Sequence, residues 1–134
     1  MPKFALNLNK FAVGTVKVYN LLINDVDQFE NFEDQLEVKY DSQFRSIGSV
    51  IYQISDNKNP PHGKRRQIIG IKGAVEIKTK NLRVYYLAIK DHDLIICIGG
   101  LKTTQKKDIG RLKALKKEID NQIEQHGKLK IKKN

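Results

Sequence analysis

Three basic residues on neighbouring predicted strands have the types and spacing best suited to chemistry. Alternation along a strand places Lys78 on the same face as Glu76, and Arg83 on the same face as Tyr85. Lys102 ends the next predicted strand. Since neighbouring strands lie about 4.8 Å apart, we expect the three cations to converge on one concave surface. Cations this close repel one another unless an anion lies among them, and a phosphate group fits this need.

Two interpretations of this cluster stay open. In the first, Arg83 holds a phosphate through two parallel hydrogen bonds, and Tyr85 or Tyr86 stacks on a nucleobase. In the second, one of the tyrosines belongs to the core, and the cations are solvated strand ends. The spacing alone favours neither interpretation.

Other catalytic and metal-binding patterns are missing from the sequence. It has no glycine-rich phosphate loop, no HExxH motif and no nucleophile elbow. The histidines His62, His92 and His126 are too scattered to indicate a metal site, and only His62, beside the basic run 64–66, draws attention. Cys97 lies in an apolar run and is expected to be an inert core thiol. We therefore expect no metal, no cofactor and no small-molecule substrate.

The charge of the chain is distributed unevenly. Its 134 residues carry 25 basic and 15 acidic side chains, a net charge of +10. Residues 1–60 hold 6 basic and 8 acidic side chains (net −2), whereas residues 61–134 hold 19 and 7 (net +12). This asymmetry is typical of a protein that binds a polyanion, and a solubility device is the alternative. A membrane surface is disfavoured, because no basic helix carries a broad apolar face.

Length and composition indicate a single domain. The 134 residues, 40% of them apolar, suit one domain, since domains usually contain about 100–150 residues. The first ten residues lack the apolar run of a signal peptide, and no segment approaches the roughly 20 apolar residues of a spanning helix. We expect a cytoplasmic protein with one domain over 1–127 and a basic tail over 128–134.

The periodicity of apolar residues predicts an α+β fold. We expect a strand over 13–23, a helical hairpin or one bent helix over 25–55, and a loop over 56–67. Three antiparallel strands and a lysine-rich helix follow, so that the sheet has three to four antiparallel strands, depending on whether the tail pairs as an edge strand. These four elements are expected over 68–79, 82–90, 94–102 and 105–125.

Three motifs follow one another in the predicted strands and helix. They are VEIK at 75–78, RVYY at 83–86 and GGLKTTQK at 99–106. In their order and spacing, over about residues 25–126, the chain resembles the RelE/HigB-type toxins of bacterial toxin–antitoxin systems. Those toxins show a Tyr/Phe-Glu-Ile/Leu-Arg strand, an Arg-Val/Ile-aromatic-aromatic strand, and a strand ending in Gly-Phe-x-Lys-Lys-Thr-Gln before a basic helix. The resemblance implies a RelE-like fold.

The resemblance also implies an activity, that of a metal-independent endoribonuclease cleaving mRNA, in many members on the ribosome. The RNA 2′-hydroxyl attacks the adjacent phosphate while cations stabilise the developing charge. The implied partners are a cognate antitoxin, mRNA and the ribosome. The residues assigned to catalysis are Lys78, Arg83, Lys102 and Tyr85, and those assigned to RNA binding are Arg65, Arg66, Gln105, Lys106, Lys107 and Arg111.

The chain departs from the family pattern at three positions. Lys78 stands where arginine is frequent, Gly100 where phenylalanine is usual, and Thr103 where a second lysine is usual. Two alternatives therefore accompany the ribonuclease hypothesis. One is a ParE-like inhibitor of gyrase, which does not need the three cations together. The other is an RNA- or DNA-binding module without chemistry, whose binding would be sensitive to salt.

Overall fold

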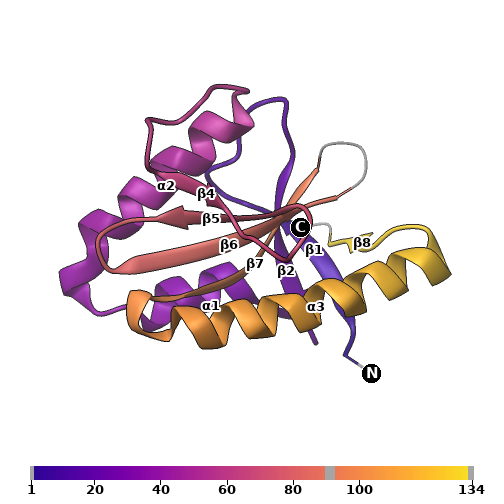
Figure 1. Ribbon diagram of the computed structural model, residues 1–134. Coiled ribbons are helices and arrows are strands. Elements are labelled where there is room, and N and C mark those ends of the chain that lie inside the picture. The colour runs from indigo at the N-terminus through magenta and orange to yellow at the C-terminus, as the bar shows by residue number, and fades with distance from the viewer. Residues whose placement is uncertain (1, 90–92, 133–134) are drawn as a thin grey trace.

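The computed structural model describes residues 2–89 and 93–132 and shows an α+β fold (Figure 1). In this part of the chain the strands are β1 (Phe4–Leu8), β2 (Val18–Ile23), β3 (Val26–Asp27), β4 (Arg65–Gln67), β5 (Ala74–Lys78), β6 (Leu82–Ala88), β7 (Leu94–Leu101) and β8 (Lys130–Ile131). The helices are α1 (Gln28–Gln35), α2 (Asp41–Ser55) and α3 (Gln105–His126), and the short 3₁₀ helices η1 (Val38–Tyr40) and η3 (Lys102–Thr104) lead into α2 and α3.

The sheet is larger than expected and mixed. Its order is β4-β5-β6-β7-β2-β1-β8, with β3 paired to β2. The pairs β2–β7 and β1–β8 are parallel and the others are antiparallel. The predicted antiparallel sheet of three to four strands is therefore wrong. A parallel pair needs a long crossover, here a path from β2 through β3, α1, α2, β4, β5 and β6 to β7. Alternation along one strand does not reveal a partner so distant in sequence.

Two segments differ in detail from the expected elements. The predicted strand over 13–23 begins only at β2. Of the predicted strand over 68–79, only β5 is a strand; residues 68–73 form the turn that joins it to β4, which lies in the predicted loop over 56–67. The chain turns there because Gly70 and Gly73 adopt φ angles of 93° and 80°, which favour glycine. Asn24 and Asp25 form a turn, but the cap of α1 is Asp27, whose carboxylate accepts hydrogen bonds from the first turn of the helix.

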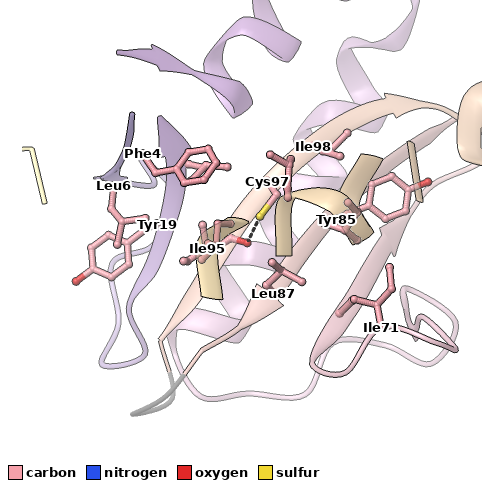
Figure 2. Packing of buried hydrophobic residues seen from close by; sticks show 14 of the residues in the cluster. Phe4, Leu6, Tyr19, Ile71, Tyr85, Leu87, Ile95, Cys97 and Ile98 are labelled. Atoms are coloured by element: carbon pink, nitrogen blue, oxygen red, sulfur yellow. Dashed lines mark hydrogen bonds between the residues drawn. The ribbon is translucent and has the colours of Figure 1, made fainter. Parts of the chain in front are cut away.

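The helices cover the two faces of the sheet. Apolar residues of α1 and α2, such as Phe29 and Ile47, pack with Val84 and Ile96 on one face. Leu112, Leu115 and Ile119 of the long helix α3 pack on the other face (Figure 1). Figure 2 shows part of this second layer, in which Tyr85, Leu87, Ile95 and Cys97 lie together. Cys97 is buried, as expected.

The end of β7 is held between helices from both faces. A Cβ atom added at Gly99 would overlap the ring of Phe32 on α1, and one added at Gly100 would overlap the carboxylate of Asp108 on α3. Asp108 also accepts a hydrogen bond of 2.7 Å from the Thr104 hydroxyl. Consecutive glycines therefore let α1 and α3 approach the same strand, which sets where α3 begins.

We expect Gly99→Ala to destabilise the fold by about 1–3 kcal/mol, because the added methyl group must displace a packed phenylalanine ring. Urea denaturation followed by circular dichroism measures this change in the free energy of unfolding. Gly110→Ala is the matched control, since a Cβ added there meets nothing within 4 Å. Equal stability of the two variants would contradict the packing described.

The C-terminal tail joins the sheet through β8, which pairs with β1 next to Ala5 and Leu6. Of the alternatives for the tail, the edge strand is the one observed. Residues 91–93, between the strands predicted over 82–90 and 94–102, lie partly outside the described residues. Within the described ranges, no helix has the length and apolar character needed to cross a membrane.

Candidate functional site

Cationic side chains surround an open hollow of about 460 Å³ at the end of the sheet where α3 begins. Lys78 and Arg83 face each other across β5 and β6, as their register shows. Lys102 opens η3 directly after β7. We call this hollow the cationic hollow, and the residues that line it are His62, Gly63, Lys64, Lys78, Thr79, Lys80, Arg83 and Lys102.

The lysines of the cationic hollow carry uncompensated charge. Among the described residues, no carboxylate lies within 4.0 Å of the ammonium group of Lys64, Lys78, Lys80 or Lys102. Lys80 and Lys102 are exposed, and Lys64 and Lys78 are half-buried. Four unpaired ammonium groups around one opening make a site for an anion such as a phosphate group.

Beneath the cationic hollow lies a buried carboxylate, Glu76, whose side chain is 1% exposed. Arg66 donates two hydrogen bonds to its Oε2 atom, at 2.9 Å and 3.2 Å. The amide of Gln105 donates to Oε1 at 2.9 Å, and Nε of Arg83 lies 2.8 Å from the same oxygen. This carboxylate therefore ties together β4, β5, β6 and α3.

Sequence reasoning placed Glu76 on the face of Lys78 but gave it no role. The available signal was a single carboxylate inside the otherwise apolar run AVEI of β5. A charge at such a position is buried at a high cost unless cations and hydrogen-bond donors surround it. Arg66 and Arg83 meet that need.

Arg83 has most of its donors engaged within the protein. Its Nη1 group donates to the carbonyl oxygens of Thr79 at 2.6 Å and Leu82 at 2.9 Å. Its Nε group forms the ion pair with Glu76, although without the alignment of a hydrogen bond. Only the Nη2 group remains for an external anion, and the residue is 7% exposed. In this arrangement Arg83 forms the floor of the cationic hollow, and it lacks the free fork that a bidentate phosphate clamp requires.

Tyr85 lies in the core and does not line the cationic hollow. It is fully buried in the core cluster on the α3 face of the sheet, to which Leu87, Ile95 and Cys97 also belong (Figure 2). Burial raises the pKa of its phenol, and the nearby carboxylate of Glu76 raises it further. Its hydroxyl has no hydrogen-bond partner among the described residues. A ring in this position cannot stack on a base.

We expect Tyr85→Phe to stabilise the fold by about 1 kcal/mol and to leave any RNA cleavage unchanged, because it removes an unpaired buried hydroxyl. Since the folded protein holds the phenolic proton more tightly than the unfolded chain does, wild-type stability should fall as the pH rises above about 10, and the variant should show a shallower fall. Thermal unfolding at pH 7 and pH 10.5 measures both. Lost cleavage in a folded variant would place the hydroxyl in the reaction.

The structure does not gather the residues assigned to RNA binding into one site. Arg65 lies on the opposite face of β4 from Arg66 and donates to the Tyr86 hydroxyl at 3.2 Å. The side chains of Arg66 and Gln105 donate hydrogen bonds to the carboxylate of Glu76. The other three, Lys106, Lys107 and Arg111, are exposed on α3 outside the lining of the cationic hollow.

The described residues include two histidines, His62 and His126, which belong to different parts of the fold. His62 lines the cationic hollow, and it is the histidine that its basic neighbours had singled out. His126 ends α3, and His92 lies outside the described residues. Within residues 2–89 and 93–132, no three His, Cys, Asp or Glu side chains gather closely enough to hold a metal ion.

Comparisons with known proteins identify no relative: no family model, no curated protein and no solved structure matches this chain.

Proposed function

We propose that this chain is a metal-independent endoribonuclease that cleaves mRNA, the toxin of a toxin–antitoxin system acting in the cytoplasm. The observation that supports the proposal most directly is the set of four lysines around the cationic hollow, none of which has a carboxylate partner among the described residues. Cleavage of a phosphodiester bond develops negative charge on the phosphoryl oxygens, and fixed cations at that place stabilise the transition state. The proposed partners are mRNA, the ribosome and a cognate antitoxin.

The proposed reaction uses the RNA itself as the nucleophile. The 2′-hydroxyl oxygen forms a bond to phosphorus, and the bond from phosphorus to the 5′ oxygen breaks, which yields a 2′,3′-cyclic phosphate and a 5′-hydroxyl. One group accepts the proton of the 2′-hydroxyl, and another donates a proton to the departing 5′ oxygen. In the proposed reaction Lys78 and Lys102, which both line the cationic hollow, hold the phosphate. His62 lines the same opening, and its imidazole is a group that can accept or donate a proton.

The test of this proposal is expression of the chain in a bacterium, with primer extension on a reporter mRNA. The proposed function requires arrest of growth and discrete cuts in the message. The fragments should end in a cyclic phosphate and begin with a 5′-hydroxyl. Arrest with intact mRNA would overturn the ribonuclease and favour a toxin that inhibits gyrase. Expression of soluble protein without arrest of growth would overturn the proposal that the chain is a toxin.

A further inference from the structure

Strand β4 leaves backbone groups open at one end of the sheet. It is the terminal strand in the sheet order and pairs with β5. The carbonyl of Lys64 accepts a backbone hydrogen bond from β5, and the N–H of Ile68 donates one to it, so the even-numbered positions bond to β5. The N–H and C=O groups of Arg65 and Gln67 therefore point away from the sheet, and they have no hydrogen-bond partner among the described residues.

The side chains along this edge are basic and are followed by one exposed apolar residue. Arg65 and Arg66 lie in β4, and Arg66 keeps 58% of its side chain exposed despite its ion pair. Ile69, just after the strand, is 99% exposed. A groove of about 330 Å³, which we call the β4 groove, is lined by β4 and by residues 60–63 among others. The edge therefore offers backbone pairing, positive charge and an apolar contact together.

We propose that this edge binds an extended acidic peptide segment of a partner protein, which adds to the sheet as a further strand beside β4. Such a strand satisfies the outward groups of Arg65 and Gln67. Its carboxylates lie on the face of Arg66, across the pair from that side chain, and an apolar residue covers Ile69. Backbone pairing of this kind requires the alternating N–H and C=O groups of a peptide, which RNA lacks.

Charge decides against a second copy of this chain as the occupant. Two β4 strands paired with each other would bring Arg65 and Arg66 of one copy next to those of the other, and like charges placed opposite each other destabilise a sheet. Basic edges are also a device that keeps sheets from aggregating. An acidic strand is the partner that this edge accepts.

The edge of β4 lies next to the cationic hollow, so a strand bound there affects the access of RNA to the hollow. His62 and Gly63 line both the β4 groove and the cationic hollow. A peptide that continues past Arg65 toward Gly63 therefore reaches over the cationic hollow and excludes RNA from it. This consequence rests on the proposed function, whereas the addition of a strand does not.

The experiment uses a synthetic peptide of eight residues, alternating glutamate and valine, with a fluorescent label. Anisotropy measures its affinity for the full chain. A second peptide with the same side chains but with alternate backbone nitrogens methylated cannot pair as a strand, and a lysine–valine peptide tests charge. On the protein, Gln67→Pro removes one outward N–H at an edge where proline is tolerated, and Gln67→Ala is the matched control.

We expect the methylated peptide to bind at least about tenfold more weakly than the acidic peptide, and Gln67→Pro to weaken binding by a similar factor relative to Gln67→Ala. The lysine–valine peptide should not bind. Equal binding of the methylated and unmethylated peptides overturns the proposal. A labelled oligouridylate is measured in the same way, because RNA cannot pair with the backbone of β4. If Gln67→Pro, but not Gln67→Ala, weakens the binding of this RNA, the proposal is also overturned. Strand addition without any RNA cleavage would leave the peptide site standing and overturn the proposed function alone.

Discussion

Replacing both Lys78 and Lys102 by alanine should lower the rate of RNA cleavage at least about 100-fold, because single groups that stabilise transition-state charge contribute factors of about 10² to 10³. Both lysines line the cationic hollow, from β5 and from η3, and neither has a carboxylate partner among the described residues. Their loss should not unfold the protein, since one is exposed and the other is half-buried. Cleavage of a labelled RNA by the purified protein measures the rate.

The dependence of RNA binding on salt gives the same two lysines a second readout. Each phosphate neutralised on a single strand contributes about −0.7 to the slope of log K against log salt concentration. Loss of both lysines should therefore make the slope shallower by about 1.4, if each contacts one phosphate. An unchanged slope would place the bound RNA elsewhere.

Glu76→Ala should destabilise the fold by about 3–4 kcal/mol, the largest stability effect we expect from a single substitution. The change leaves the guanidinium of Arg83, with 9% of its side chain exposed, without its countercharge in the interior. It also breaks the links from Glu76 to β4 and α3. A loss of this size should lower the melting temperature by roughly 10–15 °C.

Two variants make this second prediction specific. Glu118→Ala, on the exposed surface of α3, removes the same type of charge and should change stability by less than about 0.5 kcal/mol. Glu76→Gln keeps the shape of the side chain and should destabilise less than the alanine, since an amide oxygen still accepts from Gln105. If Glu76→Ala has the same melting temperature as the wild type, the carboxylate does not hold these elements together.

The elements that local periodicity could predict are those with strong patterns. Phe29, Phe32 and Leu36 recur at helical spacing and lie in or beside α1, and Gly127 ends α3 with a positive φ. The pairing of the strands could not be predicted in this way. β1 is a short apolar segment that pairs with the distant β8 as well as with β2, and β4 consists of three polar residues that pair with β5.

The candidate site divides in the same way. Alternation predicted Lys78 on the face of Glu76 and Arg83 on the face of Tyr85, and the register of β5 and β6 pairs Lys78 with Arg83. Alternation could not predict which of these side chains are buried, because it indicates the face of the sheet on which a side chain lies and not what covers that face. α3 covers the end of this face near Tyr85, whereas the end near Lys78 stays open. The same limit hid the central place of Glu76.

The most direct test compares two double variants of equal charge in the cleavage of a labelled RNA by the purified chain. Lys78→Ala with Lys102→Ala removes two of the four lysines that line the cationic hollow, whereas Lys113→Ala with Lys117→Ala removes two charges from the exposed surface of α3. Our account predicts cleavage by the wild type and the α3 variant, with 2′,3′-cyclic phosphate ends, and a loss of at least about 100-fold in the hollow variant. No cleavage by the wild type, or equal rates in the two variants, would contradict it.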